Sequence, residues 1–347
     1  MLVIAVVMGL LTVFGGTKPS RVLDPETHEW TVAQVNKFLN LENLVLVAKD
    51  ASFIAIMAVG MTAVIVMGGI DLSVGSIYAL AALLGAIALR SLQAQWLHVP
   101  YNDPGLSTDG GAPLLVSVLV GVGVCCAVGA ACGALNGALI VGLRVHPFII
   151  TLGMMTVLRG LVSVTTRGLS VSGFPESFTT GFFKAEIGGV YPVPVIIMLV
   201  VAVAGAVVLR KLVLGRHTYA IGGNETASHY AGIPVGRVKI IIYMLMGLLA
   251  GLSSSIYIGY LAAAAPDAGQ GYELSVIAAS VIGGASLSGG RGTAVGAILG
   301  AILIQLINNA MIILQIDQNY NQMVMGAAII IAVVLDQLKT RLAPLGR

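Results

Sequence analysis

One apolar stretch that is broken in its middle constrains this chain more than any other feature. Residues 59–76 read VGMTAVIVMGGIDLSVGS: an apolar run that stops at Gly68-Gly69, a lone carboxylate at Asp71, and a second apolar run from Leu72. Each glycine inside a helix costs about 1 kcal/mol relative to alanine. In lipid, the backbone groups that a break sets free need new partners, so broken helices persist only inside protein or beside a water-filled cavity. The stretch predicts two membrane helices that meet at a polar break.

Asp71 is the only carboxylate between Asp50 and Asp103, and two interpretations of it stay open. In the first, Asp71 caps the helix that starts at Leu72, with help from Ser73. In the second, Asp71 takes a direct part in a transport pathway, because a polar break between apolar spans is the usual sequence pointer to such a path. The two roles are compatible.

Composition places the chain in a membrane. Only 10% of the 347 residues are charged and 57% are hydrophobic, with a mean hydropathy of +0.97, whereas soluble domains carry about 25% charged residues. The three cysteines share one apolar span that has no histidine nearby, so we interpret them as packing residues. The sequence has no phosphate-binding glycine loop and no hydrolase motif, so we expect a chain that is not an enzyme and holds no cofactor itself.

The length of the apolar runs sets the expected fold class. A bilayer core of about 30 Å needs about 20 helical residues. We therefore expect an all-α polytopic membrane protein, a single transmembrane domain over residues 1–347 with about ten spans, some of them broken at Gly-Gly motifs. Residues 44–47 are interpreted as a separate interfacial or re-entrant piece, and residues 18–43 as a polar segment. The expected spans are 1–14, 51–67, 72–89, 114–133, 147–166, 193–209, 240–260, 274–284, 294–311 and 323–335.

Basic residues orient these spans, because they are enriched on the cytoplasmic side. With both termini in the cytoplasm, the cytoplasmic segments carry Glu225 and Asp336 as their acids, with Asp71 near that face. The long outer loops are mildly acidic and suit a soluble partner docking from outside better than a nucleic acid or an anionic lipid. The basic residues on the cytoplasmic side are Arg144, Arg210, Lys211, Arg216, Arg237, Lys239, Arg291, Lys339, Arg341 and Arg347.

The broken stretch has a second copy. Residues 68–75, GGIDLSVG, recur as residues 283–290, GGASLSGG, with Ser286 in the place of Asp71. Chance similarity in Gly-rich sequence is the alternative. A true repeat indicates two broken helices that flank one path, and the polar amides near Asn308 either tie helices together or hydrogen-bond a hydroxylated solute. The expected path residues are Gly68, Gly69, Asp71, Ser73, Gly75, Gly283, Gly284, Ser286 and Asn308.

The largest cytoplasmic segment, about residues 210–239, contains a short helix signal. Asn224 is a good N-cap, Glu225 favours a first helical turn, and Gly232 is a stop signal. The predicted helix, residues 225–231, is too short to be stable alone in water. It therefore lies on a surface, which is either the membrane or a cytoplasmic partner.

Taken together, these motifs make the chain similar to the permease subunits of ribose/xylose/arabinose-type ABC sugar importers. The similar motifs cover about residues 44–340, and they are specific together rather than singly. They are 60–65 (GMTAVI), 68–76 (GGIDLSVGS), 135–139 (LNGAL), 147–153 (PFIITLG) with Arg159-Gly160, 219–225 (YAIGGNE) and 281–292 (VIGGASLSGGRG).

The resemblance implies a homodimer in a bacterial inner membrane, served by two copies of a separate ATPase that binds ATP and Mg²⁺ and by a periplasmic sugar-binding protein. The outer segments 15–40 and 90–113 are longer than is typical, and the basic N-terminal leader is missing, which leaves the sugar open. The resemblance also places the ATPase-coupling helix within residues 219–233. The expected coupling residues are Gly222, Gly223, Asn224, Glu225, Thr226, Ala227 and Ser228.

The sequence thus predicts a permease that moves a monosaccharide by alternating access, and the scarcity of charge in its spans suits a neutral sugar. One rival is an ion-coupled secondary transporter that uses Asp71, because a carboxylate inside the membrane is functional by default. A second rival, a membrane enzyme, needs a catalytic constellation, and the sequence shows no paired carboxylates or Ser/His set.

Overall fold

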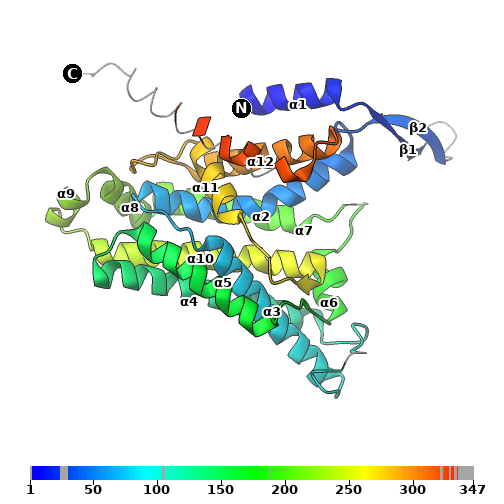
Figure 1. The fold of residues 1–347 in the computed structure, drawn as a ribbon, viewed down its shortest axis with the longest axis horizontal. Helices are drawn as coiled ribbons and strands as arrows, with labels where there is room; N and C mark the ends of the chain where they lie inside the picture. Colours follow the sequence, from blue (N-terminus) through cyan, green and yellow to red (C-terminus); the bar gives the residue numbers. More distant parts are fainter. Residues whose placement is uncertain are drawn as a thin grey trace.

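The computed structural model describes residues 2–23, 30–103, 106–188, 190–320, 323–327, 330–331 and 334. Within this part of the chain, seven apolar helices are long enough to cross a membrane, and they form the body of the molecule (Figure 1). The polytopic helical fold is thereby confirmed. The seven are α2 (Leu41–Val66), α3 (Val74–Trp96), α4 (Leu114–Leu143), α5 (Pro147–Thr166), α7 (Val193–Lys211), α10 (Val235–Leu261) and α12 (Ala294–Ile313).

The predicted count of ten spans is not confirmed, because none of the other three predicted spans is a described helix long enough to cross a membrane. Helices α1 (Leu2–Phe14) and α11 (Tyr272–Ile282) have 13 and 11 residues. At about 1.5 Å per residue, neither crosses a bilayer core of about 30 Å by itself. The span expected at 323–335 lies mostly outside the described residues. Helix α11 agrees with the predicted short span at 274–284, and it ends at the glycines Gly283 and Gly284.

The structure corrects the prediction for residues 44–47. They are part of α2, which runs unbroken through Lys49 and Asp50. The Lys49 ammonium lies 3.0 Å from an Asp50 carboxylate oxygen and 4.1 Å from the centre of the Tyr260 ring. Because the ring and the neighbouring carboxylate stabilise the ammonium, this buried charge does not interrupt the helix.

The expectation of a purely α-helical fold is also corrected. Strands β1 (Thr17–Leu23) and β2 (Trp30–Asn36) pair as an antiparallel hairpin in the segment predicted to be a polar connection. Two-residue strands β3 (Val171–Ser172) and β4 (Ala263–Ala264) form a second small pair. Both pairs lie outside the long helices, so the body remains helical.

Helix α10 packs along α4 through small residues. A side chain added at Gly129 would overlap the Gly247 carbonyl, and one at Gly251 would overlap the Cys125 carbonyl. Gly133 meets the Tyr243 carbonyl in the same way. Glycine at these positions therefore lets the two helix backbones approach closely, which larger side chains would prevent.

The short elements gather at the two ends of the long axis (Figure 1). Helices α8 (Val213–Gly223) and α9 (Glu225–Tyr230) lie at one end, which we call the α9 end. The β1–β2 hairpin and α6 (Glu176–Phe178) lie at the opposite end, which we call the hairpin end. A π-helix, η1 (Thr179–Phe183), follows α6, and a 3-10 turn, η2 (Gln318–Tyr320), follows α12.

Candidate functional site

Both Gly-Gly motifs end a helix with the same backbone cap. Gly68 has φ +88° and donates its N–H to the Ile65 carbonyl at 2.9 Å. Gly284 has φ +95° and donates its N–H to the Val281 carbonyl, also at 2.9 Å. This left-handed conformation is open to glycine at little cost. Gly68 and Gly284 therefore have equivalent structural roles. The sequence motifs instead align Gly68 with Gly283, so the structural equivalence is shifted by one residue.

Asp71 stabilises the turn that leads into α3. Its Oδ1 atom accepts hydrogen bonds from the Ser73 N–H at 2.9 Å and from the Ser73 hydroxyl at 2.6 Å. The Ser73 oxygen in turn accepts from the Asn136 amide of α4 at 2.7 Å. Asp71 and Ser73 have no exposed surface. The capping interpretation is therefore corrected: α3 begins at Val74 and not at the predicted Leu72, Ser73 is its N-cap residue, and no side chain bonds to a helical N–H there.

The backbone that the first break sets free finds partners within the protein. The Ile70 carbonyl accepts hydrogen bonds from the Tyr243 hydroxyl at 3.3 Å and from the Thr151 hydroxyl at 3.4 Å. Gly75, in the first turn of α3, packs directly on the Gly269 carbonyl. Protein therefore buries most of this break, which is one of the two settings that permit a broken helix, while Gly68 itself is exposed beside a cavity.

The second break takes a different course after its cap. Ser286 donates its N–H to the Arg291 carbonyl at 3.0 Å and closes a loop that leads to α12. Gly283 packs against the backbone of Gly296 in the first turn of α12. Ser286 therefore does not repeat the hydrogen bonds of Asp71.

Helix α8 fits between the two breaks at a contact that we call the Val66 junction, formed by Val66, Gly222 and Gly290. The Val66 carbonyl accepts a hydrogen bond from the Gly290 N–H at 2.8 Å. Gly222 lies so close to both that an added Cβ would overlap the Val66 oxygen and lie 2.7 Å from the Gly290 nitrogen. Gly222, which is predicted to couple to an ATPase, is thus wedged between Val66, two residues before the predicted path residue Gly68, and Gly290, the last residue of the second motif.

Tyr219, one turn earlier in α8, makes a second link to the same loop. Its hydroxyl donates to the Gly292 carbonyl at 2.6 Å. Burial raises the pKa of the Tyr219 phenol above its ordinary value, so the phenol stays a neutral donor at physiological pH. The hydrogen bond therefore persists across the physiological pH range.

The short helix predicted at 225–231 is confirmed as α9. The Asn224 side chain accepts a hydrogen bond from the Ala227 N–H at 2.9 Å, which is the predicted N-cap. The Glu225 carboxylate pairs with the Lys239 ammonium of α10 at 2.6 Å. Gly223, Thr226 and Ala227 are exposed, whereas Ser228 is buried. Helix α9 therefore presents an outer face to solvent while its inner face is tied to α10.

A cavity joins α9 to the first break. It has a volume of about 210 Å³, and a larger cavity of about 790 Å³ adjoins it along Arg144, His229 and Val235. Segments that the sequence assigned to the cytoplasmic side therefore meet at this end of the molecule. The smaller cavity is lined by Met67, Gly68, Gly69, His146, Pro147, Glu225, Lys239 and Tyr243.

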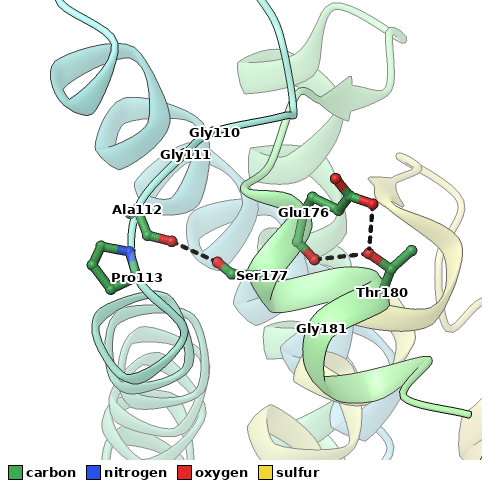
Figure 2. A pocket seen from close by; sticks show the side chains of 8 residues that line it. All are labelled: Gly110, Gly111, Ala112, Pro113, Glu176, Ser177, Thr180 and Gly181. Carbon is green, nitrogen blue, oxygen red and sulfur yellow. Dashed lines mark hydrogen bonds between the residues drawn. The ribbon is translucent and has the colours of Figure 1, made fainter.

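A third cavity lies at the hairpin end, where the loop before α4 meets α6 (Figure 2). Its volume is about 410 Å³. The Ser177 hydroxyl donates to the Ala112 carbonyl at 2.6 Å, and the Thr180 hydroxyl donates to the Glu176 carboxylate at 3.0 Å. The first bond fixes the loop to α6, and the second joins η1 to α6. No local sequence pattern signals the contact between the loop and α6.

Asn308 lies apart from the other predicted path residues. It sits in the second half of α12, where its amide donates to the Gln305 side chain at 3.3 Å. Its neighbour Asn309 exchanges hydrogen bonds with Asn43 of α2 at 2.8 and 3.2 Å. Asn309 therefore ties two helices together, as one of the two interpretations of these amides held.

The geometry of the site suits mechanical transmission. In the described part of the chain, no group of three or more His, Cys, Asp or Glu side chains is placed to hold a metal ion. What the site does offer is a direct backbone path from an exposed helix, through the Val66 junction, to the ends of two broken helices.

Seven candidate spans, two capped breaks and an exposed helix linked to both define a membrane permease. Over residues 43–333, the chain matches the family model described as the branched-chain amino acid transport system / permease component. The chain belongs to this family of ABC-transporter permeases, and the resemblance inferred from its motifs is confirmed.

Curated relatives cover most of the chain. The ribose import permease protein RbsC of Escherichia coli (strain K12) is 41% identical over 304 residues, which is 87% of this chain and 88% of the relative. RbsC of Bacillus subtilis (strain 168) is 41% identical over 303 residues, 87% of each chain. The D-allose transport system permease protein AlsC of Escherichia coli (strain K12) is 37% identical over 301 residues, 87% of this chain and 85% of the relative. No solved structure matches the chain significantly.

Proposed function

We propose that this chain is the membrane subunit of an ABC importer and carries a monosaccharide, a ribose-type pentose or a related sugar, into the cell. The observation that carries the proposal is the similarity, over 87% of the chain, to permeases named for ribose and for allose. A neutral sugar can be transported past polar groups that form weak hydrogen bonds, and it needs no charged binding site. The low charge of the chain, 10% of its residues, is consistent with such a solute.

The α9 end faces the cytoplasm and receives the ATPase. The basic residues predicted to be cytoplasmic support this orientation, since Arg144 and Lys239 line one cavity with α9. ATP and Mg²⁺ bind to the ATPase subunit. Its closure pushes the exposed face of α9, and the push passes through Gly222 to Val66 and to Gly290.

The hairpin end faces the periplasm of a bacterium and receives the sugar-binding protein. Two copies of the chain form the working permease in the inner membrane, with lipid around the pair. Only 17% of the apolar window of α5 is buried, so this helix has surface available for a partner copy, for lipid or for a path. Closure at the α9 end then alternates access between the two ends.

Reconstitution tests the proposal. The purified chain is placed in proteoliposomes with its ATPase and binding protein, and uptake of radiolabelled ribose, allose and galactose is measured. We expect ATP-dependent uptake of at least one of these sugars, which stops when the binding protein is omitted. Uphill uptake by the chain alone on an ion gradient would overturn the proposal and restore the ion-coupled alternative.

A further inference from the structure

An arginine lies inside the apolar helix α5. At about 1.5 Å per residue, Arg159 is about 18 Å from the Pro147 end of α5 and about 10 Å from the Thr166 end. Its Nη1 atom donates to the Ala268 carbonyl at 2.8 Å and to the Pro266 carbonyl at 3.3 Å. The side chain is nevertheless half-exposed in the single chain. An arginine at this depth costs about 3 kcal/mol or more when it faces lipid. The exposed part of the Arg159 side chain must therefore face protein or water.

The segment that Arg159 contacts is itself unusual for this depth. Between α10 and α11, residues 262–271 follow a non-helical course from β4 to Gly269, which packs on Gly75 of α3. Non-helical backbone at membrane depth is tolerated only when protein buries it or when it lines a water-filled cavity. Ala268 and Gly269 are buried, but Asp267 and Gln270 are exposed. This outer side of the segment therefore has the character of a water-facing wall.

Opposite charges gather on this wall without neutralising each other by direct contact. Asp267 and Glu273 both lie close enough to Arg159 to attract it electrostatically. In the described residues, neither carboxylate comes within 4.0 Å of the guanidinium to form an ion pair. Nη1 of Arg159 is engaged by carbonyls, while its other donors have no protein partner in the same described region. The remaining N–H donors of Arg159 and the carboxylate oxygens of Asp267 therefore stay available to a ligand in the same region.

The helix beside this wall leaves room for a ligand. Gly153 and Gly160 precede and follow Arg159 on α5, and a Cβ added at either would meet nothing within 4 Å. Thr156, between them in the sequence, is exposed; its hydroxyl donates to the Gly153 carbonyl at 2.8 Å and can still accept a hydrogen bond.

We propose that Arg159, Asp267 and Gln270 form a contact site for a neutral, polyhydroxylated solute in the wall of the transport path. This proposal rests on the proposed function and names where the sugar touches the permease. A guanidinium supplies several donors, a carboxylate accepts from hydroxyls, and an amide does both, so the three can hold neighbouring hydroxyl groups. Within the three, the single positive charge of Arg159 and the single negative charge of Asp267 sum to zero, which suits a solute that carries no charge.

Two exposed site variants test the proposal in the complete importer. We compare Asp267→Asn and Gln270→Ala with Asp317→Asn, which alters an exposed carboxylate in the connection after α12. Uptake of ribose, allose and galactose and binding-protein-stimulated ATP hydrolysis are measured on the same proteoliposomes. We expect both site variants to lower uptake at least fivefold while ATP hydrolysis stays within twofold of the unaltered importer, and D317N to change neither.

Each other outcome is informative. Uptake at the unaltered rate in both site variants would overturn the contact site, although the unaltered importer still transports. Equal loss of uptake and of ATP hydrolysis would show a structural role and would also overturn it. Failure of the unaltered importer would count against the proposed function instead, which separates the two claims.

A labelling experiment checks the water-facing character independently. Asp267→Cys is treated in sealed vesicles with a charged maleimide that does not cross membranes, with Val203→Cys on the exposed, apolar surface of α7 as the control. We expect rapid labelling of D267C, slowed at least threefold by an excess of the transported sugar, and no labelling of V203C. Equal, slow labelling of both would place residue 267 in lipid and would overturn the proposal.

Discussion

The carbonyl of Val66 accepts a hydrogen bond from the N–H of Gly290 at 2.8 Å. This bond joins the last residue of α2 to the loop that follows α11, so the two broken helices are connected at their ends. Gly222 of α8 packs on both partners. A displacement of α8 must therefore move the ends of both helices, because packed backbone atoms leave no slack between them.

Replacement of Gly222 by alanine should disturb this junction selectively. The new Cβ would overlap the Val66 oxygen, and overpacking of this kind costs about 1–3 kcal/mol. Gly223 is the matched control, since a Cβ there meets nothing within 4 Å. We expect G222A to lower the thermal unfolding temperature of the purified permease and G223A to leave it unchanged. Equal stability of the two variants would contradict the close packing.

The Tyr219 hydroxyl should contribute a measurable hydrogen bond. Tyr219→Phe removes the donor to the Gly292 carbonyl and should cost about 0.5–1.5 kcal/mol. Tyr230→Phe serves as the control, because Tyr230 on α9 is 88% exposed. Denaturation of both variants in detergent checks this. A Y219F protein as stable as Y230F would show that the bond adds nothing.

The ion pair between Glu225 and Lys239 should hold α9 without dominating its stability. The Glu225 side chain is 56% exposed, so loss of the pair in Glu225→Gln should cost less than about 1 kcal/mol. A charge swap, Glu225→Lys with Lys239→Glu, should recover most of the ATP hydrolysis that Glu225→Lys alone removes in the reconstituted importer. If the swap recovered nothing, the pair would not be what holds α9 in place.

Asparagine should replace Asp71 with little loss. Its side-chain oxygen can accept the two Ser73 hydrogen bonds, and its amide can donate to the Asn136 oxygen, which has no partner in the described structure. Asp71→Ala instead leaves both buried Ser73 donors without their acceptor, and an unsatisfied buried donor costs about 1–3 kcal/mol. We expect D71N to retain uptake within about threefold, whereas D71A is destabilised. Abolished uptake in a stable D71N protein would favour an ion site at this carboxylate.

Several local features of the candidate site could be predicted from the sequence, because each depends on the chemistry of neighbouring residues. The cap at Asn224, the stop at Gly232 and the breaks at Gly68 and Gly284 follow from backbone preferences of single residues. The limits of that reasoning show at residues 44–47, where the neighbouring Lys49 and Asp50 suggested a break. Tyr260, from a distant helix, provides a contact that the local pattern could not reveal.

The sequence by itself determined that this chain is a polytopic membrane permease, because apolar run length and glycine placement act within a few residues of where they occur. Only the tertiary structure decided how the parts meet. It buried Asp71 beneath Ser73 and Asn136, wedged Gly222 between two helix ends, and set Arg159 against a segment more than a hundred residues later in the chain. Such contacts depend on the packing of distant helices, which no local pattern encodes.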